Sequence, residues 1–597
     1  MVRVLSPGTL WGYAIDPNPN GAGDCLLFAL TGDATAGPIQ EIQWDPAVEA
    51  PKAPYVADSQ PFSLRIYHFN DLHGHLVKLT KGGQEPIISR LAGEIKSARE
   101  SILGNVNKAI LVFTAGDDRT GSIFDEMMNA ESKSQSIHPG YQLYSKIGVD
   151  AAVLGNHDLD RGTNYLKEAI SREAHFPVLA ANLSGSRALK EICHPAVILV
   201  IKGIRVGLIG LVTRAENHLD PSQCKIINPI TTARNLLPAL RPFCDVLIIL
   251  SHLGFSLEGS NIPMADAGDV ELANSLPPGL ADLIIGGHSH HVLNPDGLSP
   301  DNVVNDIPIV QAGALGEYLG QVDITVQSKH SRVQDAHLIP IQDLPFDQHF
   351  EEIEMRPLLH QVKKLLGRKL GMVEANPALG SLAVKNDFAR AELALSNFIT
   401  DALVSQLEKR GLSVDLVMID ASALQSGLPV GEALTLGDWF EVMPYCDSIR
   451  LYILTPKQLA GLLKDNALRI DYPYQEHIER GFLQFSHQLR YQVLMGIERK
   501  NAIPKNITLE GIPLKEFPKE TLTIATTSFI RQSARGWECN LENPCLNLLF
   551  DLDSCHYTET EIYLRQEMFA YIQDHKGISK TSGAQQDGRL KILMPGE

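Results

Sequence analysis

Residues 68–76, HFNDLHGHL, place three histidines and an aspartate directly after an apolar, alternating run. Asp71 and His73 are two residues apart, so on an extended chain both side chains project to the same side. Carboxylate and imidazole groups are metal ligands, although a polar loop that is rich in histidine would look similar. The stretch therefore raises the hypothesis of a metal site at the end of a strand.

Four further apolar runs end in the same way. With the first, the runs are RIYHFNDLH, AILVFTAGD, AAVLGNH, DVLIILSH and DLIIGGHSH. In layered α/β proteins, loops at the carboxyl ends of strands bring distant segments together. We therefore expect seven side chains to meet in one crevice: Asp71, His73, Asp117, Asn156, His252, His288 and His290.

The expected donors are oxygen and imidazole nitrogen, without a thiolate. Such a set suits Mn, Zn, Fe or Co better than Ca or Cu(I), and it does not select among those four metals. Seven donors exceed the needs of one tetrahedral ion and suffice for two divalent ions if Asp117 bridges them. Taken singly, each histidine could be an ordinary hydrogen-bonding residue, and Asp117 or Asn156 a turn residue. The order of all five endings makes coincidence a poor explanation.

Charge and cysteine content exclude several classes of protein. Asp and Glu number 70 against 52 Lys and Arg, which gives a net charge of -18. This balance repels phosphate backbones and anionic membranes, so we expect no nucleic-acid polymer as partner. A small anionic substrate is compatible only if local cations reverse the field in the pocket. The eight cysteines form no CxxC pair, so neither a zinc ribbon nor a disulfide framework is indicated.

The chain shows no membrane or export signal. No window approaches about 18 uninterrupted apolar residues, and the start lacks a basic region followed by an apolar one. We expect no membrane span and, as the sequence stands, a cytoplasmic location. A periplasmic or secreted location follows instead if a leader has been removed.

A length of 597 residues predicts two principal domains. Short apolar runs alternate with amphipathic stretches in both, which indicates an α/β fold, layered as in α+β proteins. The expected segments are an N-terminal extension and linker (1–61), a first α/β domain (62–345), an interdomain helix (346–370), a second α/β domain (371–575) and a loop-like tail (576–597).

The blocks DxH, GDxxxG, GNHD, SH and GHSH, in this order, resemble those of the calcineurin-type metallophosphoesterases. The longer forms FNDLHGH, GNHDLD and GGHSH resemble the 5'-nucleotidase family, and the similarity covers about 62–590. The resemblance implies that 62–345 is a metallophosphatase domain built as a four-layer sandwich. It also implies a bridging helix and a separate C-terminal α/β substrate domain.

Roles for individual residues follow from the same resemblance. His157 and Asp160 match the catalytic dyad of the family, in which the carboxylate orients the imidazole and the imidazole stabilises the transition state or protonates the leaving group. A pair of metal ions would clamp the phosphoester and activate a water molecule. The implied ligand sets are Asp71, His73, Asp117 and His290 for one ion, and Asp117, Asn156, His252 and His288 for the other.

The match weakens in the second domain, where relatives bind the unreactive part of the substrate. Tyr445 and Phe529 match aromatic residues that stack on a base, although each could equally be a core residue. Gln425 stands where the family has a substrate-binding arginine, Asp420 replaces an asparagine, and Arg535 replaces an acid. Tyr445, Phe529 and Arg535 are the candidate substrate-binding residues.

The helix AELALSNFITDAL carries three more matching positions, Glu392, Asn397 and Asp401. A capped amphipathic helix with solvated acids would explain these residues as well.

The sequence thus predicts a two-metal-dependent phosphoester hydrolase, similar to a 5'-nucleotidase, that acts on nucleotides or related small phosphoesters. Alternatives on the same fold are a 2',3'-cyclic-nucleotide or UDP-sugar phosphodiesterase, a thiosulfate-ester hydrolase, and a binding protein without catalysis. Other hydrolytic and nucleotide-binding motifs are absent from the sequence: GxxxxGK[ST], GxGxxG after a strand, and GxSxG.

Overall fold

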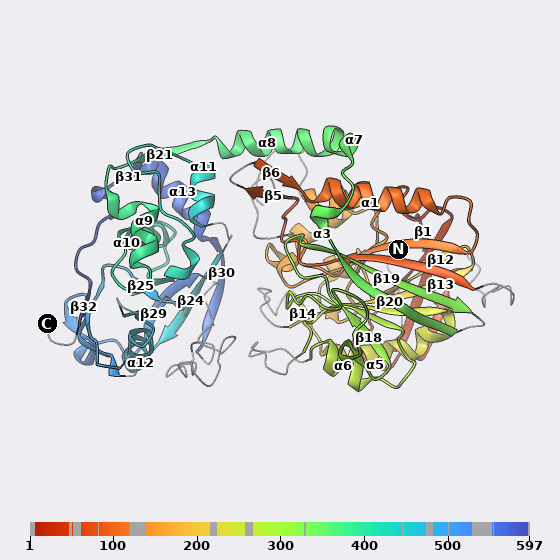
Figure 1. Ribbon diagram of the computed structural model, residues 1–597. Helices are drawn as coiled ribbons and strands as arrows, with labels where there is room; N and C mark the ends of the chain where they lie inside the picture. The colour runs from red at the N-terminus through yellow and green to blue at the C-terminus, as the bar shows by residue number, and fades with distance from the viewer. Residues whose placement is uncertain are drawn as a thin grey trace. The chain divides into compact units, whose positions relative to one another are not determined.

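The computed structural model divides into two compact units, Met1–His360 and Gln361–Glu597 (Figure 1). The residues that it describes are 6–46, 51, 61–80, 83–119, 124, 138–214, 224–256, 267–327, 330–443, 447–472, 481–498, 501–527, 552 and 555–594.

The first unit contains a seven-stranded sheet. Its strands, in spatial order, are β11 (Cys193–His194), β9 (Val178–Leu179), β8 (Ala151–Val153), β7 (Lys108–Thr114), β4 (Phe62–Phe69), β19 (Tyr318–Gln327) and β20 (His330–Pro340). β4, β7 and β8 are parallel neighbours, so their carboxyl ends lie at one edge of the sheet. β7 and β8 are apolar runs of the kind expected for strands covered on both faces, whereas the first half of β4 alternates between buried and half-buried residues.

A nine-stranded sheet packs against the first. Its strands, in spatial order, are β17 (Val303–Val304), β18 (Ile307–Val310), β16 (Leu283–Ile285), β15 (Val246–His252), β13 (Ile204–Val212), β12 (Ala196–Ile201), β2 (Cys25–Thr31), β1 (Thr9–Ile15) and β3 (Glu41–Trp44). β13, β15, β16 and β18 run parallel. Every residue of β13 and β15 is buried, because β8 of the other sheet covers one face and helices cover the other.

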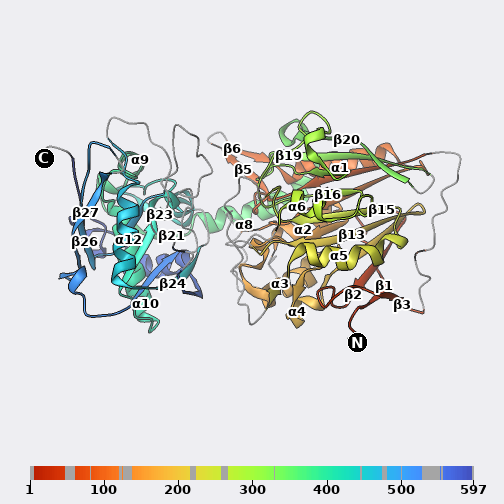
Figure 2. The same cartoon turned by 90° about the horizontal axis from the view of Figure 1, so that it is seen from below.

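Helices form the two outer layers of this unit. α1 (Ile88–Ser101) contacts β7, and α2 (Pro139–Ile147) and α3 (Gly162–Glu173) continue that layer. α5 (Pro229–Leu240) contacts β13, beside which it lies in Figure 2, and α6 (Asp269–Ser275) contacts β18. The order is helix, sheet, sheet, helix, which confirms the four-layer α/β sandwich expected from the sequence.

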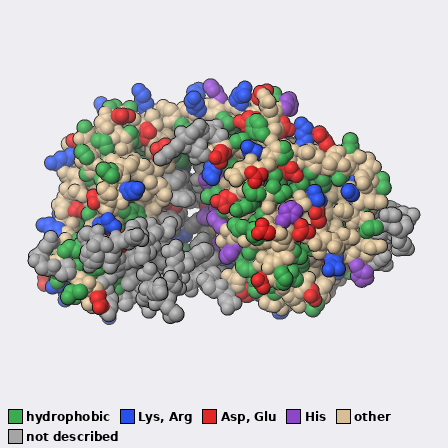
Figure 3. Space-filling view, viewed as in Figure 1, with side chains coloured by type: hydrophobic (Ala, Val, Ile, Leu, Met, Phe, Trp, Pro, Cys, Tyr) green, Lys and Arg blue, Asp and Glu red, His purple; other side chains and the backbone are tan. Residues whose placement is uncertain are grey.

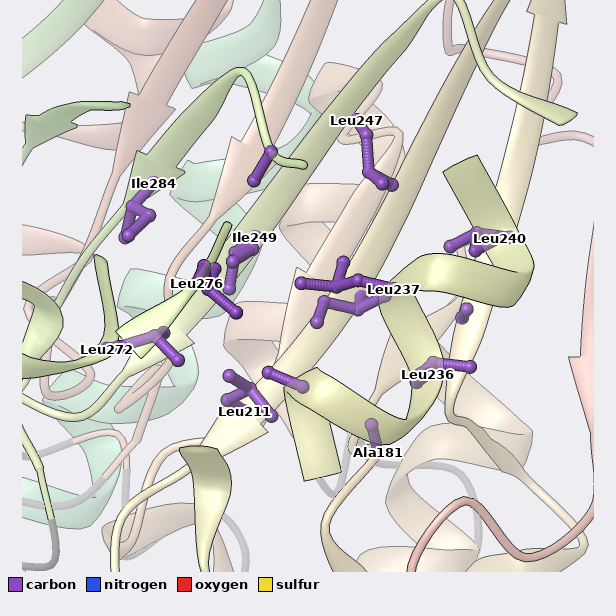
Figure 4. Close-up of a cluster of buried hydrophobic side chains, with 14 of the residues drawn as sticks. Ala181, Leu211, Leu236, Leu237, Leu240, Leu247, Ile249, Leu272, Leu276 and Ile284 are labelled. Atoms are coloured by element: carbon purple, nitrogen blue, oxygen red, sulfur yellow. The ribbon is translucent and has the colours of Figure 1, made fainter. Parts of the chain in front are cut away.

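The core between α5 and the nine-stranded sheet shows why these elements form. α5 begins at a cap in which the Asn228 side chain accepts a hydrogen bond from Thr231 N at 2.9 Å. Its apolar residues recur at helical spacing, and Figure 4 shows Leu236, Leu237 and Leu240 lying against Leu211, Leu247 and Ile249 of the strands. Each such leucine contributes about 1.5–3 kcal/mol through its burial.

The N-terminal segment belongs to this unit, which corrects the expectation of an extension and linker over 1–61. β2 pairs antiparallel with β12, and β1 and β3 extend the sheet beyond β2. The loop between β1 and β2 is also bound: Asn18 Nδ2 donates to Ser145 O and Val149 O, both at 3.1 Å. Ala22 N donates to Asp150 Oδ1 at 2.9 Å.

A helical segment runs across the boundary between the units. It consists of α7 (Gln348–Phe350), a π-helical stretch (Glu351–Met355) and α8 (Arg356–Leu366). The boundary between the units falls within α8, between His360 and Gln361. In the part of the chain that the structure describes, no helix is long and apolar enough to span a membrane.

The second unit is also α/β. Its five-stranded sheet contains, in spatial order, β25 (Leu483–Phe485), β22 (Leu416–Asp420), β29 (Leu522–Thr527), β24 (Ser448–Leu454) and β30 (Tyr557–Tyr563). A four-stranded sheet contains β28 (Ile512–Pro513), β27 (Ile503–Leu509), β26 (Leu489–Leu494) and β32 (Leu590–Leu593). α10 (Ala394–Lys409) packs on β22 and β25, and against α13 (Leu564–Asp574).

Two strands come from the C-terminal segment, so the expectation of a loop-like tail over 576–597 is wrong. β31 (Gly577–Ile578) pairs parallel with β21 (Lys369–Val373), and β32 pairs parallel with β26. The Gly- and Lys-rich composition concealed strands of only two and four residues.

On the face drawn in Figure 3, acidic and basic side chains of the described residues are interspersed.

Candidate metal centre

The five expected strand ends lie in the two sheets that pack against each other in the first unit. β4, β7 and β8 end before the segments that carry Asp71, Asp117 and Asn156, and β15 and β16 end at or before those that carry His252 and His288. Side chains from these loops form two groups. Within each group, the possible ligand atoms all lie within 4.8 Å of one another. The groups are Asp71, His73 and His290, and Asp117, His252 and His288.

The two groups adjoin. His252 Nε2 is 3.1 Å from Asp117 Oδ2 and 3.8 Å from Asp71 Oδ1. His73 Nε2 is 3.9 Å from a carboxylate oxygen of each aspartate. Asp71 and Asp117 therefore lie between the imidazole rings and are close enough to serve neighbouring ions.

Asn156 is fully buried next to the Asp117 loop. It precedes a short 3-10 turn, His157–Leu159, whose first residue donates from its backbone N to Asp117 Oδ1 at 2.9 Å. The preceding Gly155 allows this approach, because a Cβ at that position would lie 2.0 Å from Asp117 Oδ1. The glycine of the GNHD block thus permits the contact between the two loops.

Five of the expected ligands have a backbone conformation that non-glycine residues seldom adopt. Their φ angles are 51° for Asp71, 46° for His73, 52° for Asp117, 75° for His288 and 56° for His290. A residue held in such a conformation costs about 1–3 kcal/mol and persists only where its surroundings over-determine it. The concentration of these residues where the donors converge indicates a functional site.

The hydrogen bonds of His252 test whether the residues fit a cation. Its Nδ1 is 2.6 Å from Ala115 O, which can only accept, so Nδ1 carries a hydrogen. A neutral ring would then direct the lone pair of Nε2 toward Asp117 Oδ2, which is also an acceptor. Burial alone would lower the pKa of His252, but the charges of Asp117 and Asp71 raise it to about 10.

The site therefore calls for positive charge between His252 and the carboxylates. His73 Nε2 and His290 Nε2, at 3.2 Å from each other, form a second pair of possible ligand atoms. A divalent cation can replace the proton in such a cluster, because ligands bind metals in their deprotonated forms. The donor set fits two divalent metal ions.

His157 and Asp160 form a hydrogen-bonded pair beside this cluster. His157 Nδ1 is 3.0 Å from Asp160 Oδ2, and the ring of His157 lies 5.5 Å from that of His73, centroid to centroid. Because the carboxylate accepts, Nδ1 carries the hydrogen and Nε2 is the atom that can exchange a proton with a substrate. The pair has the geometry of an oriented general acid.

Three residues that the sequence analysis missed hold the ligand loops. Asn70 Nδ2 donates to Asp71 Oδ2 at 2.6 Å. Asp158 accepts from Gly155 N at 2.8 Å and from Asp118 N at 3.2 Å. Burial and the charge of Asp117 raise the pKa of Asp158 to about 7. The third residue is Gln311, whose Nε2 donates to Gly287 O at 3.0 Å.

The motifs contained only part of the signal for these residues. Asn70 and Asp158 lie inside FNDLHGH and GNHDLD, where their places next to ligands could have marked them. Gln311 lies in no metal block, and its contacts arise only from folding.

The candidate substrate residues Tyr445, Phe529 and Arg535 lie outside the described residues. Asp420, in place of the family's asparagine, is buried, and its Oδ1 accepts from Ser422 N at 2.9 Å and Phe482 N at 3.1 Å. This carboxylate therefore caps a turn of its own chain.

Glu392 and Asp401 are not the solvated acids of an amphipathic helix, and Glu392 precedes α10, which begins at Ala394. Glu392 accepts from Asp587 N at 2.7 Å and Gly588 N at 3.0 Å, and Asn397 Nδ2 donates to Gln585 O at 2.8 Å. Asp401 bonds through both oxygens to Arg589, at 3.0 and 2.8 Å. All three side chains bind the C-terminal segment.

Comparisons with known proteins agree with this architecture. Residues 64–292 match the family model described as calcineurin-like phosphoesterase, and residues 376–541 match the C-terminal domain of 5'-nucleotidase. Protein UshA of Yersinia enterocolitica is 24% identical over 525 residues, which cover 80% of this chain and 86% of that protein. A 5'-nucleotidase of Vibrio cholerae is 29% identical over 340 residues, 53% of this chain and little more than half (56%) of its own length.

Solved structures share the fold. The chain is similar to a 5'-nucleotidase precursor from Thermus thermophilus, with a TM-score of 0.55 and 21% identity over 89% of this chain and 99% of that one. It is also similar to the NAD nucleotidase of Haemophilus influenzae, with a TM-score of 0.56 and 15% identity over 90% and 100% of the two chains.

A four-layer sandwich with paired metal-ligand groups beside a histidine–aspartate pair defines a metallophosphoesterase. With both matched domains in order, the chain belongs to the 5'-nucleotidase family of calcineurin-like metallophosphoesterases, and it is a hydrolase of phosphoesters.

Proposed function

We propose that this protein is a two-metal phosphomonoesterase that acts on nucleotides or related small phosphoesters. The observation that carries the proposal is the pair of adjoining donor groups around Asp71 and Asp117, with the His157–Asp160 pair at their side. One ion would be bound by Asp71, His73, Asp117 and His290, and the other by Asp117, Asn156, His252 and His288.

When bound, two divalent ions supply Lewis acidity toward the phosphoryl oxygens and a water of lowered pKa. The residues of the chain perform the remaining work. Asp160 keeps His157 in one orientation, and the protonated Nε2 of His157 either donates to the leaving oxygen or hydrogen-bonds the phosphoryl group as charge develops. The buried aspartates and His252 hold the centre in a region of low dielectric, where its charges act strongly.

Mn, Zn, Fe and Co all remain compatible with this donor set. Binding of the unreactive part of the substrate falls to the second unit, where Tyr445 and Phe529 would stack on a base and Arg535 would supply a cation. Gln425 in place of the family's arginine favours contacts that differ from those of related nucleotidases.

The test uses the full chain, stripped with a chelator and reloaded separately with each of the four metals. Substrates are an aryl phosphate, a panel of nucleoside 5'-monophosphates, 2',3'-cyclic nucleotides and a UDP-sugar. Metal-dependent release of phosphate from the monophosphates is the expected result. Cleavage of the diesters alone would replace monoester hydrolysis with a phosphodiesterase, and no turnover with any metal would overturn the proposal.

A further inference from the structure

The segment Gln311–Gly313 follows β18, the parallel neighbour of β16, and contains none of the expected metal ligands. It nevertheless contacts both loops of the first donor group. We call these three residues the 311–313 brace. Its contacts connect the loop of Asp71 and His73 with the loop of His288 and His290.

Gln311 is fully buried and uses both ends of its amide on the second of these loops. Nε2 donates to Gly287 O at 3.0 Å, and Oε1 accepts from Ser289 Oγ at 3.2 Å and from His291 N. The three contacts flank His288 and His290 on either side. A movement of the backbone at either histidine would therefore break at least one of these hydrogen bonds.

Asn70 connects the same brace to the other loop. Its Oδ1 accepts from Ala312 N at 2.8 Å, and its Nδ2 donates to Gly313 O at 2.7 Å and to Asp71 Oδ2 at 2.6 Å. Asp71 in turn accepts from His288 N at 3.0 Å. The brace, Asn70, Asp71 and the His288 loop therefore form a closed ring of hydrogen bonds, which are buried around Asn70 and partly buried at the His288 loop.

The two loops that this ring connects contain residues with a strained backbone conformation. Asp71, His73, His288 and His290 all have positive φ, and they belong to the two loops that the brace joins. Strained residues keep their conformation only while neighbouring contacts enforce it. When those contacts are lost, the donor atoms move apart, and metal affinity depends steeply on their placement.

We propose that Gln311 and Asn70 are positioning residues that set the separation of the two metal sites. The inference rests on the proposed function, since it assigns the brace to the same centre. Gln311 positions His288 and His290, which fall in different donor groups, so its loss should weaken the binding of both ions. Asn70 positions Asp71, so its loss should chiefly weaken the binding of the ion held by Asp71, His73 and His290.

The experiment measures Mn²⁺ binding to the metal-free full chain by isothermal titration calorimetry. Gln311→Met keeps the length of the side chain and removes its three hydrogen bonds, and Asn70→Leu does the same at its site. We expect about tenfold to hundredfold weaker binding in each, the range for the loss of partners that orient metal ligands. The electron paramagnetic resonance signal of two coupled Mn²⁺ ions should change shape in Gln311→Met.

Asn466→Leu is the matched control. Asn466 is a buried amide of the second unit that bonds Leu483 O and Leu483 N at 2.9 and 2.8 Å. Its replacement should lower the melting temperature as the other two do and leave Mn²⁺ affinity unchanged. The comparison separates an effect on the ligands from a general loss of stability.

The outcomes distinguish a failure of the proposed function from a failure of the role assigned to the brace. If the unaltered protein binds none of Mn²⁺, Zn²⁺, Fe²⁺ and Co²⁺, the proposed function fails, and if it prefers one of the other three metals, the same comparison is made with that metal. If it binds two ions and Gln311→Met binds them equally well with an unchanged signal, only the role of the brace is overturned. Should Gln311→Met not fold, Asn70→Leu decides, and wild-type affinity there overturns the proposal. An equal loss of affinity in Asn466→Leu would also overturn it.

Discussion

Asp117 and His157 lie next to one another and should fail in different ways when replaced. Asp117 touches His252 and accepts from His157 N, so Asp117→Ala removes a donor shared by both proposed ions. His157 is hydrogen-bonded to Asp160 and belongs to neither donor group. We expect His157→Ala to keep its metal and to lose about 10²–10⁴-fold in kcat, the usual contribution of a positioned acid or base.

Metal content by elemental analysis and kcat on an aryl phosphate distinguish the two variants. Asp117→Ala should lose both metal and activity. Asp160→Asn is the control, because it keeps the shape of the pair and weakens only the orientation of the imidazole. Full metal content and turnover in Asp117→Ala would refute the two-metal assignment.

The candidate site was visible in the sequence where its signal was local. Asp71 and His73 stand out because they follow an apolar run at fixed spacing, and His288 and His290 repeat that spacing. Gln311 was invisible, since its partners Gly287, Ser289 and His291 are brought to it only by the pairing of β16 with β18. Composition cannot reveal a buried amide whose role is defined by backbone contacts.

At the scale of elements, β2 is the clearest test of the N-terminal segment. Phe28 is 5% exposed and packs in the core beneath α5, whereas Leu26 on the same strand is 63% exposed. Phe28→Ala should reduce the free energy of unfolding of the first unit by about 3–5 kcal/mol. Leu26→Ala should change it by less than about 0.5 kcal/mol.

Urea denaturation of the two variants, monitored by the hydrogen exchange of β12 peptides, measures both values. If 1–61 were only an extension and linker, Phe28→Ala would cost as little as Leu26→Ala. The place of this segment in the sheet cannot be read from the sequence, because a Pro- and Ala-rich run, 45–61, separates its strands from the rest of the domain. The pairing of β2 with β12 is a contact between distant positions that local composition does not encode.

The C-terminal segment offers a second test at this scale. Arg589 is buried and donates to Asp401 and Asp587, while Lys409 on the same helix as Asp401 forms an exposed pair with Asp574. Arg589→Met removes the buried cation that Asp401 and Asp587 share, leaving only the exposed Arg490 and His487 beside them, and should cost up to about 3–5 kcal/mol. Lys409→Met should cost at most about 1 kcal/mol.

The pH dependence of unfolding checks the same ion cluster. Burial opposes ionisation of Asp401, but His487 and Arg589 hold its pKa below the usual value. A lowered pKa in the folded state stabilises the protein above the unfolded pKa, and that stability is lost as pH falls through the folded value. Urea melts between pH 7 and pH 3 should therefore converge for the unaltered chain and Arg589→Met, and parallel curves would contradict this account.

At the scale of the whole molecule, the alternation of apolar runs and helices was enough to predict two α/β domains. The order of the layers followed from the family resemblance. The boundaries expected at 61 and 576 are wrong, because β1 to β3 and β31 to β32 belong to sheets whose other strands come from the two domains. Long, periodic segments carry their structure locally. Short strands at the ends of the chain take theirs from a partner.

Metal removal should act on one unit and spare the other. The donors all come from the first unit, and ions that bind only the folded state stabilise it by about 2.7 kcal/mol at a free concentration one hundred times Kd. Chelation should lower the melting temperature and speed the hydrogen exchange of β15 peptides, with β22 peptides unchanged. Lower pH should reduce the stabilisation, because His73, His252 and the carboxylates bind metal only when deprotonated. Equal changes in β15 and β22, or none in either, would show that the ions do not bind where the donor groups converge.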